Sequence, residues 1–414
     1  MVTGRPDQHA TSVVSASFRR CSSCRNALKK KKCLVARHRS SIIGTRWSLA
    51  VDVIYIMNDM IAQTAEHTRP HHRPMDGIPL HRIAVIRPFT RFLTKVGASV
   101  ERGFSRARLP VCALEDVDNY VPSRGFWAFL IDMARREHME DLGFRVGMRF
   151  GANGPDPRIS ELLRASPTLY RGVARACEMT NKTITNCTMG MMPSRRDGYT
   201  YVFHSPSCGA DNPAVEQIGW FGLGILIGMI REYAGAEWQP TEIGLMTHRA
   251  PNRHIRNTLP VPRVRQSQPA SYIELPNSML SLPPPGPDTR AAGERAIGYE
   301  KCPVGFVGTM RTLVATYVQE SEFSIKDAAA LCDTSVRTLQ RNLKQCGTSY
   351  SEVLDEARFQ IARRLLREPQ VRIAEISYRL GYANPTHFSR AFRRIAGVSP
   401  KSYRQAQTCA SQAH

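Results

Sequence analysis

Apolar residues recur at helical spacing from residue 83 onwards, which predicts a folded domain that begins with helices. One predicted helix has an apolar face of four residues, Phe126, Leu130, Met133 and Ala134. A second helical stretch has an apolar stripe that leads to a buried Val173, and this stripe consists of Leu162, Leu163 and Tyr170. We therefore expect the first half of this domain to be mainly helical.

Short runs of β-prone residues follow these helices. We expect strands over residues 183–192, 199–204, 242–247 and 272–275. A mostly apolar helix over residues 215–234 separates the second strand from the third. Helices followed by strands in this order predict an α+β domain, which we place at residues 61–285.

A proline-rich segment ends this domain. Four prolines lie between Ser281 and Pro287, and each lacks the backbone donor that a helix or central strand needs. The segment predicts a linker over residues 286–302.

The first 60 residues have a different composition. They are rich in Arg, Lys, Ser and His, with four consecutive lysines at positions 29–32. We expect a disordered basic tail there. Two interpretations stay open: the tail is translated, or the true start is Met57, Met60 or Met75.

Two segments of the same design lie in tandem in the C-terminal region, over residues 324–344 and 372–394. Each has a short helix, a tight turn and a longer helix. The turns are Asp333-Thr334 and Gly381-Tyr382, and matching positions are 48 to 50 residues apart. A duplication of this kind predicts an all-α double helix-turn-helix domain over residues 303–408, with a helix over residues 351–367 as the spacer between the copies.

The longer helix of each copy has two chemically different faces. The predicted inward residues are Leu339 and Leu343 in the first copy, and Phe388, Phe392 and Ile395 in the second. Ser335 and Asn384 are expected to cap the helix starts. Our candidate DNA-binding residues are Ser335, Arg337, Thr338, Gln340, Arg341, Lys344, Asn384, Thr386, His387, Ser389, Arg390 and Arg393.

This region resembles the AraC family of bacterial transcription regulators. Four stretches carry the resemblance, at residues 373–376, 380–382, 387–394 and 397–404. Two positions depart from the family pattern: Asp333 stands where Gly is frequent, and Leu343 where Phe is common. The resemblance implies that the two longer helices enter successive major-groove segments. It also makes Arg337, Gln340 and Arg341 the main base readers, with Thr386 and Arg390 as the second set.

Residues 83–290 resemble the N-terminal half of the subgroup that includes ornithine-use regulators. The resemblance rests on residues 114–118, 142–147 and 165–169 and on Leu282-Pro283, where the chain leaves this domain. It implies a domain that binds a small effector, dimerises, or does both. The family likeness also implies contact between the second copy and RNA polymerase.

Charge and composition agree with a nucleic-acid partner. The 414 residues have a formal net charge of +22, and residues 301–414 contain 17 Lys or Arg against 9 Asp or Glu. Basic side chains gain affinity for a polyanion through counterion release. No apolar run approaches the roughly 20 residues that cross a bilayer. The 11 cysteines form no repeating framework, so we expect reduced thiols and a cytoplasmic, nucleoid-associated protein.

The sequence signals for catalysis, metal binding and a ligand cavity are weaker. His204, Cys208 and Asp211 resemble a nucleophilic set only by proximity in sequence, so we expect no enzyme activity. The spacing of Cys21, Cys24, Cys33 and His38 fits no established zinc module, and we expect neither metal nor cofactor. Four large side chains are either an apolar cavity or plain core, namely Trp220, Phe221, Met229 and Trp238.

The leading interpretation is a sequence-specific transcription regulator, an activator that responds to a small-molecule effector. Its expected partners are double-stranded DNA, RNA polymerase, the effector and a second copy of the chain. The alternative is a constitutive or architectural DNA-binding protein without an effector. An enzyme with a DNA-binding appendage ranks third. The sequence leaves the effector, the operator and the sign of regulation open.

Overall fold

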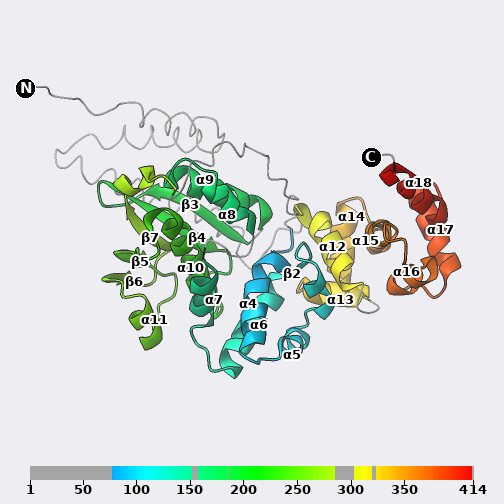
Figure 1. Cartoon of the computed structure of the whole chain (residues 1–414). Coiled ribbons are helices and arrows are strands. Elements are labelled where there is room, and N and C mark those ends of the chain that lie inside the picture. Colours follow the sequence, from blue (N-terminus) through cyan, green and yellow to red (C-terminus); the bar gives the residue numbers. More distant parts are fainter. Residues whose placement is uncertain (1–76, 152–156, 185, 285–302, 319–322, 413–414) are drawn as a thin grey trace, which may run out of the picture. The chain divides into compact units, whose positions relative to one another are not determined.

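The computed structural model describes residues 77–151, 157–184, 186–284, 303–318 and 323–412 (Figure 1). Three expectations lie outside these residues: the basic tail with its alternative starts, the cysteine and histidine set at residues 21–38, and the linker over residues 286–302. The structure contains the α+β domain and the all-α double helix-turn-helix domain that the sequence predicts.

Helices form most of the first domain. They are α4 (Ile83–Lys95), α5 (Val100–Arg106), α6 (Ser123–Arg136), α7 (Leu142–Phe150), α8 (Pro157–Arg164), α9 (Leu169–Thr183), α10 (Val215–Ala234) and α11 (Arg253–Thr258), with the 3-10 turns η1 (Val111–Glu115) and η3 (Asn277–Ser281). The predicted face of α6 is buried, and α10 has the bounds that the sequence predicts. Tyr170 was predicted wrongly, because 45% of its surface is exposed on α9.

Two sheets complete the first domain. A two-stranded antiparallel ribbon pairs β1 (Leu80–Arg82) with β2 (Tyr120–Pro122). The larger sheet has the order β3-β4-β7-β5-β6 and is antiparallel except between β5 and β6. Its strands are β3 (Cys187–Pro193), β4 (Tyr199–Pro206), β5 (Glu242–Gly244), β6 (Arg263–Arg265) and β7 (Ser271–Pro276). The long helix α10 packs on β4 and β7, as Figure 1 shows in green.

The first predicted strand begins too early. Residue 183 ends α9, and the Thr183 hydroxyl donates to the backbone carbonyl of Met179 at 3.0 Å, one helical turn back. A β-branched residue therefore ends a helix where its propensity favours a strand. The strand itself starts at Cys187.

Glycines allow α7 and α10 to pack with their backbones almost in contact. A Cβ atom on Gly143 would lie 1.9 Å from the Gln217 carbonyl oxygen, and one on Gly147 would lie 2.7 Å from that of Phe221. The Gly143 amide donates to the Gln217 side chain at 2.8 Å. Side chains larger than hydrogen at these two positions would force the helices apart.

Seven helices form the second domain in the described residues. They are α12 (Gly305–Tyr317), α13 (Ile325–Leu331), α14 (Val336–Gln345), α15 (Tyr350–Leu365), α16 (Ile373–Arg379), α17 (Pro385–Ala396) and α18 (Pro400–Gln412). The two predicted copies are α13-α14 and α16-α17, and α15 is the predicted spacer. Its apolar stripe includes the buried residues Val353, Ala357 and Ile361.

One predicted inward residue of the second domain is on the surface. Ile395 is 37% exposed, whereas Phe388 and Phe392 are each 2% exposed. Ile395 lies in the last turn of α17, which ends before the left-handed Gly397, and there the protein core no longer covers it. The prediction that it points inward was wrong.

Candidate nucleic-acid interface and internal pocket

Helix α14 begins at a side-chain cap and buries one apolar stripe. The Ser335 hydroxyl accepts from the Thr338 backbone amide at 3.1 Å, so the predicted cap is confirmed. The Thr338 hydroxyl also lies 3.0 Å from the Ser335 oxygen. Leu339 and Leu343 are fully buried in the domain core, which confirms the predicted inward stripe.

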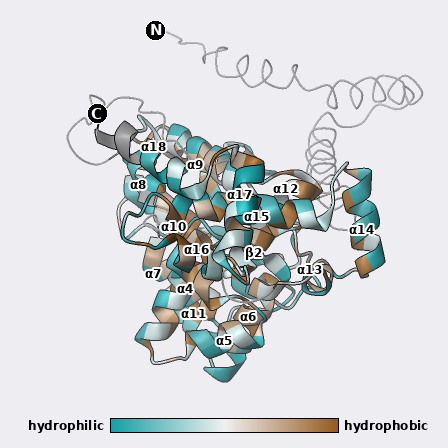
Figure 2. Cartoon of the chain, turned by 90° about the vertical axis from the view of Figure 1, so that its right-hand side faces the viewer, coloured by the Kyte–Doolittle hydropathy of each residue, from teal (hydrophilic) through white to brown (hydrophobic). Residues whose placement is uncertain are grey.

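The opposite face of α14 is basic and exposed. Arg337, Gln340, Arg341 and Lys344 are all exposed, and the helix contains no acidic residue. Hydrophilic and hydrophobic turns alternate along this helix in Figure 2. No salt bridge joins these three cations to the described residues. Their charges are therefore available to an external anion.

Helix α17 repeats this arrangement. Asn384 accepts from the His387 backbone amide at 3.0 Å, which confirms the second predicted cap. The side chains on the outward face are exposed at Thr386, His387, Arg390 and Arg393, and partly buried at Ser389. Arg390 and Arg393 make no salt bridge with the described residues.

A neighbouring arginine shows the contrast. Arg394 forms a salt bridge with Asp355 on the spacer helix α15, so its charge serves to hold α17 against α15. The spacer itself starts with a capping box, in which Ser349 and Glu352 bond to each other's backbone amides. The exposed basic face of α17 is thus attached to a well-capped helix. Which residues of the two basic faces contact bases stays a prediction.

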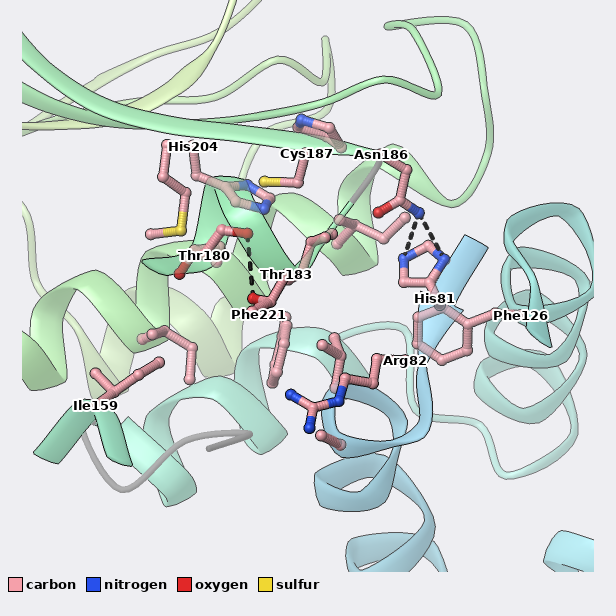
Figure 3. Close-up of a pocket in the computed structure, with 18 of the residues that line it drawn as sticks. His81, Arg82, Phe126, Ile159, Thr180, Thr183, Asn186, Cys187, His204 and Phe221 are labelled. Carbon is pink, nitrogen blue, oxygen red and sulfur yellow. Dashed lines mark hydrogen bonds between the residues drawn. The ribbon is translucent and has the colours of Figure 1, made fainter. Parts of the chain in front are cut away.

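A second candidate site lies inside the first domain, between α4, α9, α10 and β4 (Figure 3). We call it the His81 pocket. Its walls are mainly apolar, and the large side chains that line it include Phe89, Phe126, Ile218, Phe221, Ile225 and Met229. Two of the four large residues that the sequence offered as cavity or core, Phe221 and Met229, line this pocket. Trp220 packs instead edge-on against Phe144.

Three polar side chains meet at one end of the pocket. The Asn186 amide nitrogen lies 2.6 Å from Nδ1 of His81 and 2.7 Å from the Ser123 oxygen, and His81 Nδ1 lies 3.0 Å from that oxygen. The three residues come from β1, α6 and the segment before β3. The Asn186 Oδ1 atom is buried and has no hydrogen-bond partner among the described residues. In Figure 3 it points away from His81.

His204 on β4 lies on another side of the pocket, against Gly222 of α10. A Cβ atom at Gly222 would lie 2.5 Å from His204 Nδ1, so only glycine leaves room for this imidazole. Burial lowers the pKa of His204 to about 4, and burial together with the nearby His204 lowers that of His81 to about 3. Both imidazoles are therefore uncharged at neutral pH.

The three residues that are grouped only by proximity in sequence, His204, Cys208 and Asp211, are not assembled around this pocket. His204 lines it, but Cys208 and Asp211 do not. Burial raises the pKa of the Cys208 thiol to about 12, so the thiol stays protonated at neutral pH and is a poor nucleophile. In the described part of the chain, no group of three His, Cys, Asp or Glu side chains could hold a metal ion, and no helix is long and apolar enough to cross a membrane.

Sequence reasoning missed His81, Ser123 and Asn186. They are distant in the chain, and each is a single polar residue in an apolar neighbourhood, which the sequence pattern does not distinguish from a satisfied core residue. No motif or spacing in the sequence links the three residues, so the sequence gives no signal that would have found them.

Comparisons with known proteins agree with both halves of the structure. Residues 97–284 match the family model for the arabinose-binding domain of AraC transcription regulators, and residues 309–406 match a model for a helix-turn-helix domain. The ornithine utilization regulator of Pseudomonas aeruginosa is 39% identical over 82 residues, which are 20% of this chain and 24% of the relative. The transcriptional activator RhaS of Escherichia coli is 42% identical over 72 residues, 17% of this chain and 26% of that protein.

A solved structure was also found, that of the transcriptional regulator CdpR from Pseudomonas aeruginosa. It is 19% identical, covers 78% of this chain and 98% of its own, and has a TM-score of 0.39. The alignments to the two curated relatives span about a quarter of the length of each.

The duplicated helix-turn-helix and its basic faces define a protein with a helix-turn-helix domain of the nucleic-acid-binding type. With the arabinose-binding-type domain in front of it, the chain has the two domain types of AraC transcription regulators, matched over residues 97–284 and 309–406.

Proposed function

We propose that this protein is a sequence-specific DNA-binding transcription regulator that responds to a small-molecule effector. The observation that carries the proposal is the pair of exposed basic faces on α14 and α17, whose cations lack acidic partners in the described residues. Such faces on duplicated recognition helices suit entry into the major groove, where arginine and amide side chains read base edges.

Within these faces the residues have different proposed roles. Arg337, Gln340 and Arg341 read bases from α14, and Thr386 and Arg390 read bases from α17. The remaining candidates, Ser335, Thr338, Lys344, Asn384, His387, Ser389 and Arg393, position the helices through caps or phosphate contacts. Ser335 and Asn384 support this division because their side chains are already engaged at the helix starts.

The effector site is the His81 pocket, in a domain of the arabinose-binding type. A route to the DNA-binding domain runs along β1. His81 faces the pocket, whereas the preceding Leu80 is buried with Leu313 of α12. Successive side chains of a strand point to opposite faces, so the same strand contacts both sites. The backbone amide of Ile78 also donates to the Thr309 hydroxyl of α12 at 3.0 Å.

The finer parts of the function are proposals as well. Activation is supported by the name of the relative RhaS, and a non-enzymatic role by the regulator names of both curated relatives. Contact with RNA polymerase, dimerisation through the first domain and a cytoplasmic location follow from the family likeness. The domain limits proposed are 61–285 and 303–408, joined by a linker at 286–302.

Selection of bound duplexes from a random DNA pool by the purified full chain tests the proposal. We expect one enriched motif with two half-sites one helical turn apart, and binding to it at moderate salt that is at least about 10³-fold tighter than to unrelated DNA. Tight binding without an enriched motif would favour the constitutive architectural protein instead. Absence of DNA binding would exclude both.

A further inference from the structure

The charge pattern of the His81 pocket restricts what it can hold. No Asp, Glu or Lys is present among the described residues that line it. Arg82 is the guanidinium among them, and it is ion-paired with Asp118, with only 8% of its side chain exposed. A cationic ligand would therefore find no counter-charge. An anionic ligand would have to compete with Asp118.

The histidines do not change this balance. His81 and His204 are deeply buried, and desolvation lowers the pKa of each far below neutrality. They offer neutral nitrogen atoms rather than positive charges. Transfer of an ionised ligand group from water into such surroundings is strongly unfavourable when no opposite charge meets it.

Three buried polar atoms of the pocket lining have no hydrogen-bond partner among the described residues: Asn186 Oδ1, His204 Nδ1 and Trp127 Nε1. Asn186 Oδ1, at the end of the pocket where His81 and Ser123 meet, marks where the polar group of a ligand would be held. Asn186 is 2% exposed and lines the pocket, and its Oδ1 atom has no partner while its Nδ2 atom is used by Ser123 and His81 (Figure 3). Turning the amide over would only exchange which of its two polar atoms is unpaired. A buried polar atom without a partner costs free energy, which a ligand hydrogen bond would recover.

One of the two threonine hydroxyls that line the pocket is already occupied. The Thr183 hydroxyl donates to the backbone carbonyls of Met179 and Thr180, at 3.0 and 3.3 Å. A polyhydroxylated ligand such as a sugar would lose several bonds to water and regain few. A diamino acid such as ornithine would bring ammonium groups to walls without a carboxylate.

We infer that the His81 pocket binds an uncharged, mainly apolar small molecule with one polar group, a hydroxyl or an amide, that forms a hydrogen bond with the unpaired polar atom of the Asn186 side chain. The inference rests on the proposed function, in which the first domain is a sensor, and it names the ligand class. The inferred ligand class differs from the sugar after which the domain type is named, and from the ornithine in the name of the relative.

Probes that share one tail and differ in the polar group test the ligand class. Octanamide, octanoate and octylammonium are titrated into the full chain by calorimetry, with L-ornithine and L-arabinose in parallel. We expect octanamide to bind at least about tenfold more tightly than either charged probe, and the other two compounds not to bind. Tighter binding of octylammonium, octanoate, ornithine or arabinose, or no binding of octanamide, would overturn the inference.

Variants locate the binding site. Asn186→Ala should weaken octanamide binding about tenfold, because the ligand loses its hydrogen-bond partner. Because Asn186 also bonds within the domain, a second variant leaves that polar group intact: Val85→Phe, which fills the pocket from α4 and should abolish binding. Val264→Phe, at a half-buried valine on β6 away from the pocket, is the matched control and should bind octanamide normally. Normal binding by Val85→Phe would contradict the site.

The same preparations separate this inference from the proposed function. If the protein selects a DNA motif but does not bind octanamide, the proposed regulatory function stands and the inferred ligand class is wrong. If the protein binds octanamide but selects no DNA motif, the ligand site stands and the proposed sequence-specific regulation is wrong.

Discussion

Asp333 and Gly381 occupy the same turn position in the two helix-turn-helix copies, and both have left-handed backbones, with φ of 52° and 71°. Glycine adopts this conformation without steric cost, and Asp is among the few other residues that tolerate it. The departure of Asp333 from the family pattern therefore preserves the turn. Its carboxylate also lies 2.9 Å from Arg124, but both side chains are largely exposed, so this pair adds little stability.

We expect Gly381→Ala to lower the free energy of unfolding by about 1–2 kcal/mol, because a Cβ atom is strained at this φ. A Cβ there would also lie 3.3 Å from the Arg358 guanidinium. Gly308→Ala is the matched control: it lies within α12, a Cβ there would make only ordinary van der Waals contact with Pro303 at 3.9 Å, and the substitution should raise stability by up to about 1 kcal/mol. Urea denaturation measures both. Equal effects of the two substitutions would contradict the turn argument.

Loss of a base-reading arginine should weaken specific binding. We expect Arg341→Ala and Arg390→Ala each to cost about 1–3 kcal/mol on the selected DNA motif, while the fold stays intact. Arg136→Ala, on α6 of the first domain, removes the same charge from a residue that is paired with Asp132 and serves as the control. Fluorescence anisotropy at fixed salt gives the affinities. Unchanged binding by both recognition-helix variants would show that other residues read the bases.

Lys344 is predicted to contact phosphate rather than a base. Lys344→Ala should therefore weaken binding to specific and unrelated DNA by a similar factor, and should lower the slope of log affinity against log salt by about 1. Titrations at four salt concentrations on both duplexes provide the slope. A loss confined to the specific duplex would reassign Lys344 as a base reader.

The pocket histidines predict a loss of stability in mild acid. In the unfolded chain each histidine binds a proton below its ordinary pKa of 6.5, whereas burial lowers the pKa to about 3 for His81 and about 4 for His204 in the folded protein. The contribution of the two uncharged histidines to the free energy of unfolding is thus complete above pH 6.5. It falls as the pH decreases towards their pKa values in the folded protein. We expect a loss of about 2 kcal/mol per histidine between about pH 7 and 5.

The control for this pH dependence is His81→Gln, which keeps a polar side chain but removes one titrating group. Urea denaturation of both proteins at the two pH values should show a smaller acid-induced loss in the variant. The same loss in both proteins would mean that His81 does not titrate as its burial implies.

Leu80 is expected to matter for communication between the domains as well as for stability. Leu80→Ala removes a fully buried contact with Leu313 of α12, and we expect it to reduce the effect of octanamide on DNA affinity. Leu109→Ala, at another buried leucine of the first domain, should lower stability without this loss of coupling. Anisotropy titrations with and without octanamide measure the coupling. Equal coupling in the two variants would exclude β1 as the route.

The sequence predicted the parts of the fold that depend on local patterns. Helix α10 was found with its bounds because its apolar run is long, and the two helix-turn-helix copies because their patterns repeat. Prediction was wrong where tertiary context decides the outcome: Thr183 continues a helix despite its β-branched side chain, and Ile395 keeps the spacing of Phe388 and Phe392 but lies beyond the core.

The two candidate sites differ in the same way. The basic faces were predictable because every residue of each face belongs to one helix. The His81 pocket was not, because 105 positions separate His81 from Asn186 along the chain and no spacing rule connects them. The packing of β1 and α6 against the segment before β3 brings these residues together.

The glycine contacts between α7 and α10 also determine which wall of the His81 pocket can move when a ligand enters. Phe221 and Gly222 belong to a helix whose backbone rests directly on α7 at Gly147, without side chains between them that could change rotamer. Such a junction is stiff, because any approach or rotation produces backbone overlap. A molecule entering the cavity would therefore displace the short ribbon that holds His81 more readily than the long helix opposite it, and that ribbon is one of the elements of the first domain that contact α12.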